Sequence, residues 1–124
     1  MLGRLLRFLF LLILSGFGWA QADESAREIP AAFQGEWNSD VASCGTSRNA
    51  TRLRIGADWI AFHESEGKVE VFASQGAREL ALIALLQGEG ERWQSFRHFR
   101  LSEDGQRLSD ITYGSNFVRQ RCPD

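Results

Sequence analysis

The stretch that decides the fold runs from Thr51 to Ser74 and reads "TRLRIGADWIAFHESEGKVEVFAS". Within it, Leu53 and Ile55 point to one side, whereas Arg52 and Arg54 point to the other. This alternation with a period of two residues is typical of a β-strand that buries one face. The pattern returns in the segments that follow, so the stretch predicts consecutive strands rather than helices.

Glycines mark the reversals between these segments. Gly67 in "ESEGK" predicts a hairpin between strands at 58–64 and 68–74, and Asp104-Gly105 is a strong signal for a second hairpin. Further reversals are expected at "QGEGE" (87–91) and at Gly114. In the strand at 68–74, simple alternation places Val69, Val71 and Ala73 on one face and Glu70, Phe72 and Ser74 on the other.

The whole pattern predicts about eight short strands, near residues 33–38, 50–56, 58–64, 68–74, 78–86, 92–100, 106–113 and 116–121. The segment at 78–86 is ambiguous, because its Ala and Leu residues favour a helix, but its position between strands favours a strand. In "ERWQSFRHFRL", Trp93 and Phe99 fall on one face and Phe96 on the other, which predicts a β-bulge. The fold class is therefore all-β, a small antiparallel up-and-down barrel, because closure removes exposed strand edges.

The first 22 residues have the pattern of a cleaved signal helix. Arg4 and Arg7 precede an apolar run at 8–14, and Ala20-Gln21-Ala22 has the small-residue pattern of a cleavage site. The run is shorter than the roughly 20 residues of a membrane-spanning helix. We therefore expect a signal peptide at 1–22, a leader at 23–32 that is loose or forms a short helical turn, and one barrel domain at 33–124. The product is expected to be a periplasmic or secreted monomer with no stable membrane anchor.

Charge argues against nucleic acid as a partner. The chain has 14 Lys and Arg residues against 16 Asp and Glu residues, and the basic ones are scattered. Binding to a phosphate backbone uses clustered basic residues. No nucleic-acid function is therefore expected.

The chain has two cysteines, Cys44 and Cys122. In an exported protein such a pair predicts a disulfide, which here would close a loop spanning most of the barrel domain and contribute about 4–5 kcal/mol at most. A metal site is the alternative for the pair, but the chain lacks the cluster of ligands that zinc requires. A reduced Cys44 acting as a nucleophile is a second alternative.

Two short stretches carry a resemblance to a known family. "FQGEWN" (33–38) and the late "NFVRQRC" (116–122) resemble the ends of calycin barrels, the lipocalins and avidins. The resemblance implies that Gly35 and Trp37 lie on the first strand with the indole across the closed end of the barrel. It further implies that Arg119 or Arg121 packs on the indole face, a contact that cation–π attraction stabilises. The tryptophans of an avidin biotin pocket are absent, so ligand identity does not carry over.

The aromatic residues point to binding rather than catalysis. Aromatic side chains suit pockets and interfaces, although in small β domains they also form ordinary core. We expect a small, partly apolar ligand to contact the following side chains: Trp59, Phe72, Trp93, Phe96 and Phe99.

Residues for catalysis or cofactors are not apparent. His63 and Glu64 are adjacent, so on a strand they would point to opposite faces, and His98 has no acid at a useful spacing. No nucleophile motif, phosphate loop, cofactor site or metal site is expected. The protein is thus expected not to be an enzyme.

A second hypothesis is an inhibitor of, or docking partner for, another exported enzyme. The leader "DESAREIPA" (23–31) or the loop "NSDVASCGTSRN" (38–49) would then make the contact. In its size and its export signal, the chain also resembles small exported proteins of Gram-negative bacteria. Among these, inhibitors of proteases and of lysozyme have similar dimensions. A cavity lined by Trp and Phe would favour the ligand hypothesis, and a filled interior with a protruding loop would favour docking.

Overall fold

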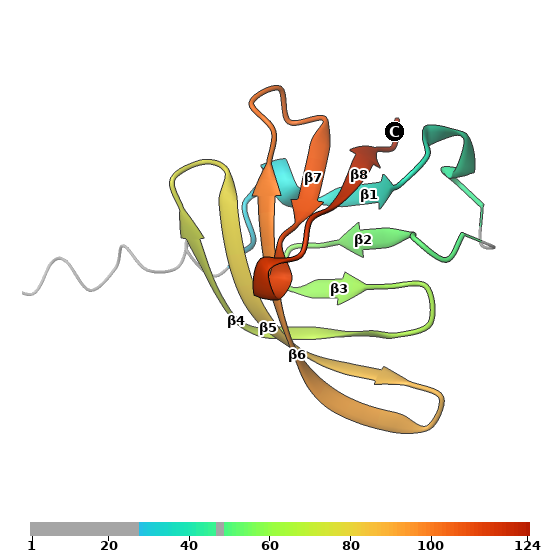
Figure 1. Ribbon diagram of the computed structural model, residues 1–124. Helices are drawn as coiled ribbons and strands as arrows, with labels where there is room; N and C mark the ends of the chain where they lie inside the picture. The colour runs from blue at the N-terminus through green and yellow to red at the C-terminus, as the bar shows by residue number, and fades with distance from the viewer. Residues whose placement is uncertain (1–27, 47–48) are drawn as a thin grey trace, which may run out of the picture.

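The computed structural model describes residues 28–46 and 49–124 and forms a closed antiparallel barrel in which each strand pairs with the next and the last pairs with the first (Figure 1). The predicted all-β up-and-down barrel is confirmed. The strands are β1 (Gly35–Asn38), β2 (Leu53–Ile55), β3 (Trp59–Ala61), β4 (Glu66–Gln75), β5 (Glu79–Gly88), β6 (Glu91–Leu101), β7 (Arg107–Asp110) and β8 (Phe117–Arg121). The predicted signal peptide and leader residues 23–27 lie outside the described residues.

Short 3-10 turns complete the described structure, at η4 (Ala31–Phe33), η5 (Val41–Ser43) and η6 (Thr112–Gly114). Within residues 28–46 and 49–124, none of the helices has the length and apolar character needed to cross a bilayer. The described end of the leader packs against the barrel, because Ile29 is buried in the core and its N–H donates to the Ala57 carbonyl at 2.8 Å.

The ambiguous segment at 78–86 is a strand. β5 pairs with β4 on one side and β6 on the other, and its buried residues Leu80, Leu82, Ala84 and Leu86 alternate with half-exposed ones. Ladder hydrogen bonds on both sides, together with one fully buried face, outweigh the helix propensity of Ala and Leu.

The expected bulge in "ERWQSFRHFRL" was wrong. The register between β5 and β6 runs without interruption from Glu79 opposite Arg100 to Gly88 opposite Glu91. Trp93 and Phe99 therefore share one face of a regular strand, and Phe96 lies on the other.

The bulge lies in β4 instead. There Val69 pairs with Ala84 and Val71 with Ile83, which leaves Glu70 as an extra residue. Because an extra residue reverses the alternation of the strand, the expected grouping of Val69 with Val71 was also wrong. Val69 is buried, whereas Val71 is exposed on the outside of the barrel.

One hydrophobic cluster fills the middle of the barrel, with Phe62 and Phe72 packed against it as half-buried members. Its buried residues come from every strand except β8 and from the segment before β1. They are Ile29, Phe33, Trp37, Leu53, Ile55, Ile60, Val69, Leu80, Leu82, Ala84, Leu86, Phe99, Leu101 and Leu108. Side chains of this size occupy an eight-stranded barrel interior.

Trp37 closes one end of the barrel, as the resemblance implied. The Arg121 guanidinium carbon lies 4.1 Å from the centre of its ring, and the indole N–H donates to the Phe33 carbonyl at 3.0 Å. Arg121 also donates to the carbonyls of Gly105 and Gln34, both at 2.9 Å, and to that of Ala32. Of the two candidate arginines, the stacking partner is therefore Arg121.

Gly35 has a backbone reason to be glycine. Its φ is +122°, a conformation that side-chain-bearing residues rarely adopt, and a Cβ there would meet Arg121 Nη1 at 3.4 Å. The Gly-x-Trp pattern thus combines a special backbone position with the indole that closes the barrel.

The opposite end, which we call the far end, is where the strand connections lie that comprise the described residues 39–46 and 49–52, 62–65, 89–90 and 111–116. In an up-and-down barrel, successive connections alternate between the two ends, so these four share one end. Figure 1 shows the β5–β6 hairpin reaching away from the rest of the barrel on this side. Functional side chains on a rigid scaffold often come from such loops.

Candidate functional site

Of the five expected ligand-binding residues, the structure brings only Phe72 and Phe96 to one surface hollow, and the other three lie elsewhere. Phe99 is fully buried in the core, and Phe72 packs half-buried against it. Phe96 lies on the outside of β6, where its ring centre is 5.6 Å from that of Tyr113. Trp59 and Trp93 lie in two further places.

The two remaining tryptophans are equally exposed but face different sides. Trp59 is 40% exposed, covers the backbone of Gly56 and lies under the Arg54 guanidinium, which is 5.7 Å from its ring centre. Its neighbour Ile60 is in the core, so Trp59 points outward. Trp93 is 39% exposed and pairs with the core residue Leu86, so it lies on the inward face beyond the packed interior.

The inward face at the far end carries charges in place of hydrophobic side chains. Arg97 pairs with the core residue Leu82, Asp110 with Phe99, and Arg119 with Leu108. Because directly paired residues share a face, all three point into the barrel. We call Arg97, Asp110 and Arg119 the far-end cluster.

One carboxylate serves both arginines of the cluster. Oδ2 of Asp110 lies 3.4 Å from Arg97 Nη1 and 3.8 Å from Arg119 Nη1. Its other oxygen, Oδ1, accepts from the backbone N–H of Thr112 at 3.1 Å and from its hydroxyl at 2.5 Å. Asp110 is thereby fixed in place, and the cluster keeps one positive charge that no partner within it compensates.

Aromatic rings hold the two guanidinium groups. Arg97 lies over Phe62, with its guanidinium carbon 4.6 Å from the ring centre, and Arg119 lies over Phe117 at 4.7 Å. Nε of Arg119 also donates to the Thr51 carbonyl at 2.8 Å. Flat stacking on a ring suits the guanidinium and contributes cation–π attraction.

Two N–H groups of the cluster are buried without a hydrogen-bond partner among the described residues. They are Nε of Arg97 and Nη1 of Arg119. Arg119 is only 8% exposed, and its burial and the charge of Arg97 lower its pKa, against the opposing effect of Asp110. Unpaired buried polar groups cost free energy, so this end of the barrel is not optimised for stability alone.

Sequence reasoning missed Arg97, Asp110, Phe62 and Phe117 as candidates. One local signal was present, because Arg97 has the same parity as Trp93 and Phe99 and so belongs on the inward face. The partners of Arg97 come from other strands, and no spacing along the chain could identify them. Arg119, which the resemblance offered as a possible partner of Trp37, belongs to this cluster.

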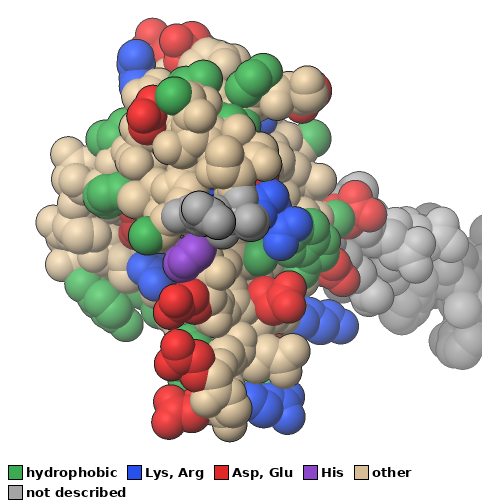
Figure 2. Space-filling model, turned by 90° about the vertical axis from the view of Figure 1, so that its right-hand side faces the viewer, with side chains coloured by type: hydrophobic (Ala, Val, Ile, Leu, Met, Phe, Trp, Pro, Cys, Tyr) green, Lys and Arg blue, Asp and Glu red, His purple; other side chains and the backbone are tan. Residues whose placement is uncertain are grey.

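A surface hollow of about 350 Å³ lies on the outer wall of the barrel near the far end. Arg54, Ala61, Glu66 and Gln87 line it and pair with one another on the outward face, and the connection after β3, including Phe62, completes it. Figure 2 looks at the side of the molecule where several far-end connections lie and shows acidic and basic side chains mixed around a histidine. The hollow is therefore mainly polar and opens on the outer surface, and Phe62 is the one lining residue that also contacts the far-end cluster.

The expectations for the two histidines need correction. His63 and Glu64 lie in the connection after β3 rather than on a strand, so they are not forced apart, and Nε2 of His63 is 3.9 Å from Oε1 of Glu64. His98 does have an acid nearby, because Glu79 on β5 lies 3.6 Å from its Nε2. Glu79 also accepts two hydrogen bonds from Arg100, which together with the neighbouring His98 lower its pKa.

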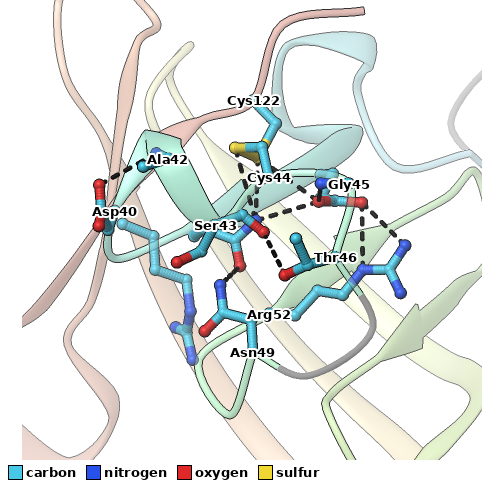
Figure 3. Close-up of a disulfide and its surroundings, with 12 residues drawn as sticks. Asp40, Ala42, Ser43, Cys44, Gly45, Thr46, Asn49, Arg52 and Cys122 are labelled. Carbon is cyan, nitrogen blue, oxygen red and sulfur yellow. Dashed lines mark hydrogen bonds and ion pairs between the residues drawn. A yellow bond between two sulfur atoms is a disulfide. The ribbon is translucent and has the colours of Figure 1, made fainter.

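The disulfide between Cys44 and Cys122 is confirmed, and it fixes the loop after β1 against the outside of the barrel (Figure 3). Asn38 donates to Cys122 Sγ at 3.0 Å, and Asp40 caps the turn by accepting from the Ala42 N–H at 3.0 Å. The sulfur atoms lie near Glu36, but a disulfide offers no thiolate to a metal ion.

Glu36 is the polar centre of this loop. Oε2 accepts from the Gly45 N–H at 3.0 Å and Oε1 pairs with Arg52 at 2.9 Å. Burial raises the pKa of Glu36, but these hydrogen bonds and the charge of Arg52 outweigh it and hold the pKa below its ordinary value of 4.5. The ionised carboxylate therefore stabilises the folded loop.

This arrangement makes stability depend on pH. A depressed pKa in the folded state contributes stability that is present above about pH 4.5 and is lost as the pH falls through the folded-state pKa. We expect Glu36→Gln to lower the thermal midpoint at pH 7, and the gap to the parent protein to narrow at pH 3. Thermal unfolding followed by circular dichroism at both pH values measures this gap, with Glu91→Gln at the exposed start of β6 as the control. A gap of constant size would contradict the role given to the carboxylate.

Comparison with known proteins returned no matching family model, no matching curated protein and no matching solved structure.

Proposed function

We propose that this protein is a non-catalytic, exported binding protein that holds a small, partly apolar molecule at the far end of its barrel. The proposal includes a relationship to the lipocalins, which the stacking of Arg121 on Trp37 behind Gly35 supports. It places the ligand above the packed core rather than deep inside the barrel, because the core residues occupy the interior.

The observation that carries the proposal is a pair of exposed aromatic residues on the inward face. Trp93 pairs with Leu86 and is 39% exposed, and Phe117 pairs with Asp110 and is 41% exposed. The apolar residues of the core, which share this face, are buried. Large aromatic side chains that remain exposed to water on a concave face are typical of small-molecule sites.

A hollow on the outer wall near the far end offers further space for part of such a molecule. Its volume of about 350 Å³ is at the lower end of the range of roughly 300–1,000 Å³ known for ligand pockets. Phe62 belongs to the hollow and also contacts the far-end cluster through Arg97. Phe62 thus connects this outer hollow to the charged groups on the inward face.

The two equally exposed tryptophans provide a matched test. N-phenylnaphthylamine, a neutral fluorescent probe, is titrated into the parent protein and into the Trp93→Ala and Trp59→Ala variants. We expect Trp93→Ala to weaken binding about tenfold, because it removes an aromatic contact, and Trp59→Ala to leave binding unchanged. No binding to the parent protein, or an equal loss in both variants, would contradict the proposed site.

A second candidate function, docking to another exported enzyme, rests on the loop after β1. Val41 is half exposed at η5, in a segment that the disulfide and the Asp40 cap hold in one shape. A preorganised loop loses little conformational entropy on binding. If this function is correct, Val41→Asp abolishes capture of an exported partner enzyme while Trp93→Ala leaves it intact.

A further inference from the structure

We propose that the ligand of the far end carries an anionic group, of carboxylate, sulfonate or phosphate type, which binds between Arg97 and Arg119. This inference rests on the proposed function and names the chemical class of its ligand. The small molecule would thus have an apolar body and an acidic head.

The charge balance of the far-end cluster is the first argument. Two guanidinium groups lie within 4 Å of a single carboxylate oxygen, Oδ2 of Asp110, at 3.4 and 3.8 Å. Oδ1 of the same carboxylate is already occupied by the N–H and hydroxyl of Thr112. A second anion would balance the remaining positive charge.

The unpaired donors are the second argument, and they are independent of the net charge. Nε of Arg97 and Nη1 of Arg119 are buried and have no hydrogen-bond partner among the described residues. Arg119 is more than nine-tenths buried and lies 3.8 Å from Asp110, too far for a hydrogen bond. An anionic oxygen would accept from such donors through charge-assisted hydrogen bonds.

Access is the third argument. The side chain of Arg97 is 31% exposed, whereas that of Arg119 is 10% exposed, so the cluster opens toward solvent on the side of Arg97. Phe62 lies under Arg97 and is only partly buried against the core, so an apolar body beside this ring would bring an acidic head within reach of the guanidinium groups. The geometry matches the amphipathic ligand proposed above.

A pair of probes with the same ring system isolates the effect of the charge. Anilinonaphthalene sulfonate and N-phenylnaphthylamine differ by the sulfonate. We expect the parent protein to bind the sulfonate about tenfold more tightly than the neutral probe, the size expected for a hydrogen bond to a charged group. In Arg97→Gln the preference disappears while the affinity for the neutral probe is retained. Arg100→Gln on the outside of β6, where Arg100 pairs with Glu79, leaves both affinities unchanged.

A variant that is expected to bind the sulfonate more tightly, rather than more weakly, strengthens the test. Asp110→Asn removes the carboxylate that competes for both arginines, so we expect the sulfonate to bind more tightly and the neutral probe to bind as before. Circular dichroism and the thermal midpoint of every variant establish that it is folded. If Asp110→Asn fails to fold, the comparison of Arg97→Gln with Arg100→Gln decides the question alone.

The outcomes separate this inference from the proposed function. Equal affinity for both probes, or a preference for the sulfonate that survives Arg97→Gln, overturns the anion site and leaves the far-end ligand site standing. If neither probe binds, the proposed function fails, and the anion site fails with it. Competition by a medium-chain alkyl carboxylate, but not by the alcohol of the same length, extends the result from sulfonates to carboxylates.

Discussion

The free energy of unfolding falls by about 3–5 kcal/mol when Trp37 is replaced by alanine. The indole is fully buried, donates to the Phe33 carbonyl and supports the guanidinium of Arg121. Its removal leaves a cavity at the closed end and an arginine without its stacking partner. Small domains are stable by about 5–15 kcal/mol in total, so this change removes a large share. Chemical denaturation followed by circular dichroism measures the loss.

Trp59→Ala is the matched control for this experiment. Trp59 is 40% exposed on the outside of the barrel, so its truncation is expected to cost about 1 kcal/mol or less. If Trp37→Ala were as mild as Trp59→Ala, the closed end would not depend on the indole. Unchanged stability with loss of ligand affinity would instead assign Trp37 to the binding site.

Loss of the disulfide is the second large effect. Replacing both Cys44 and Cys122 with alanine should lower the free energy of unfolding by about 2–5 kcal/mol, because the bond restricts the unfolded chain and fixes the loop after β1. The bond also lies next to barrel closure, since the N–H of Cys122 donates to the Glu36 carbonyl on β1 at 2.9 Å. Thermal and denaturant unfolding measure the difference.

Reductant distinguishes the disulfide from the effect of the substitutions themselves. It should lower the thermal midpoint of the parent protein toward that of the double variant and leave the double variant unchanged. Intact mass should rise by two hydrogens on reduction of the unfolded parent protein. A parent protein whose midpoint does not respond to reductant would show that the bond contributes little to stability.

Local alternation predicted most of the fold. In β2 and β3, each side chain's position relative to the core follows from the parity of its residue number, and Gly105 lies where the chain reverses between β6 and β7. The hairpin between β3 and β4 was also predicted, but Gly67 was wrongly placed in its turn: the turn is at 62–65, and Gly67 pairs within β4, where a Cβ would meet the Leu85 carbonyl. The ambiguity at β5 arose because Ala and Leu fit both helix and strand, and only pairing with β4 and β6 decides between them. The bulge was placed in the wrong strand because Phe96 is an aromatic residue on the outer face of a regular strand, whereas the strand that does contain the bulge, β4, alternates in sequence without a visible break.

The candidate site was much less predictable. The five residues chosen from the sequence are all aromatic. In the structure they lie on different sides of the barrel wall, in the core, on the outer surface and at the far end. The far-end cluster combines residues from β6, β7 and β8 with a ring that follows β3. Such a grouping depends on which residues pair across strands, and the composition of any one strand does not encode it.

The sequence by itself determined the all-β barrel with strands in sequential order and the pairing of its two cysteines. The first follows from local spacing and the second from residues too few to pair otherwise, whereas the contact of an arginine with Trp37 was implied only by the resemblance. The tertiary structure alone decided that Arg121 rather than Arg119 stacks on Trp37, that Glu70 forms the bulge, and that Arg97 and Arg119 share Asp110. The physical reason is that alternation sets which face a side chain takes, whereas register across the barrel sets which side chains meet.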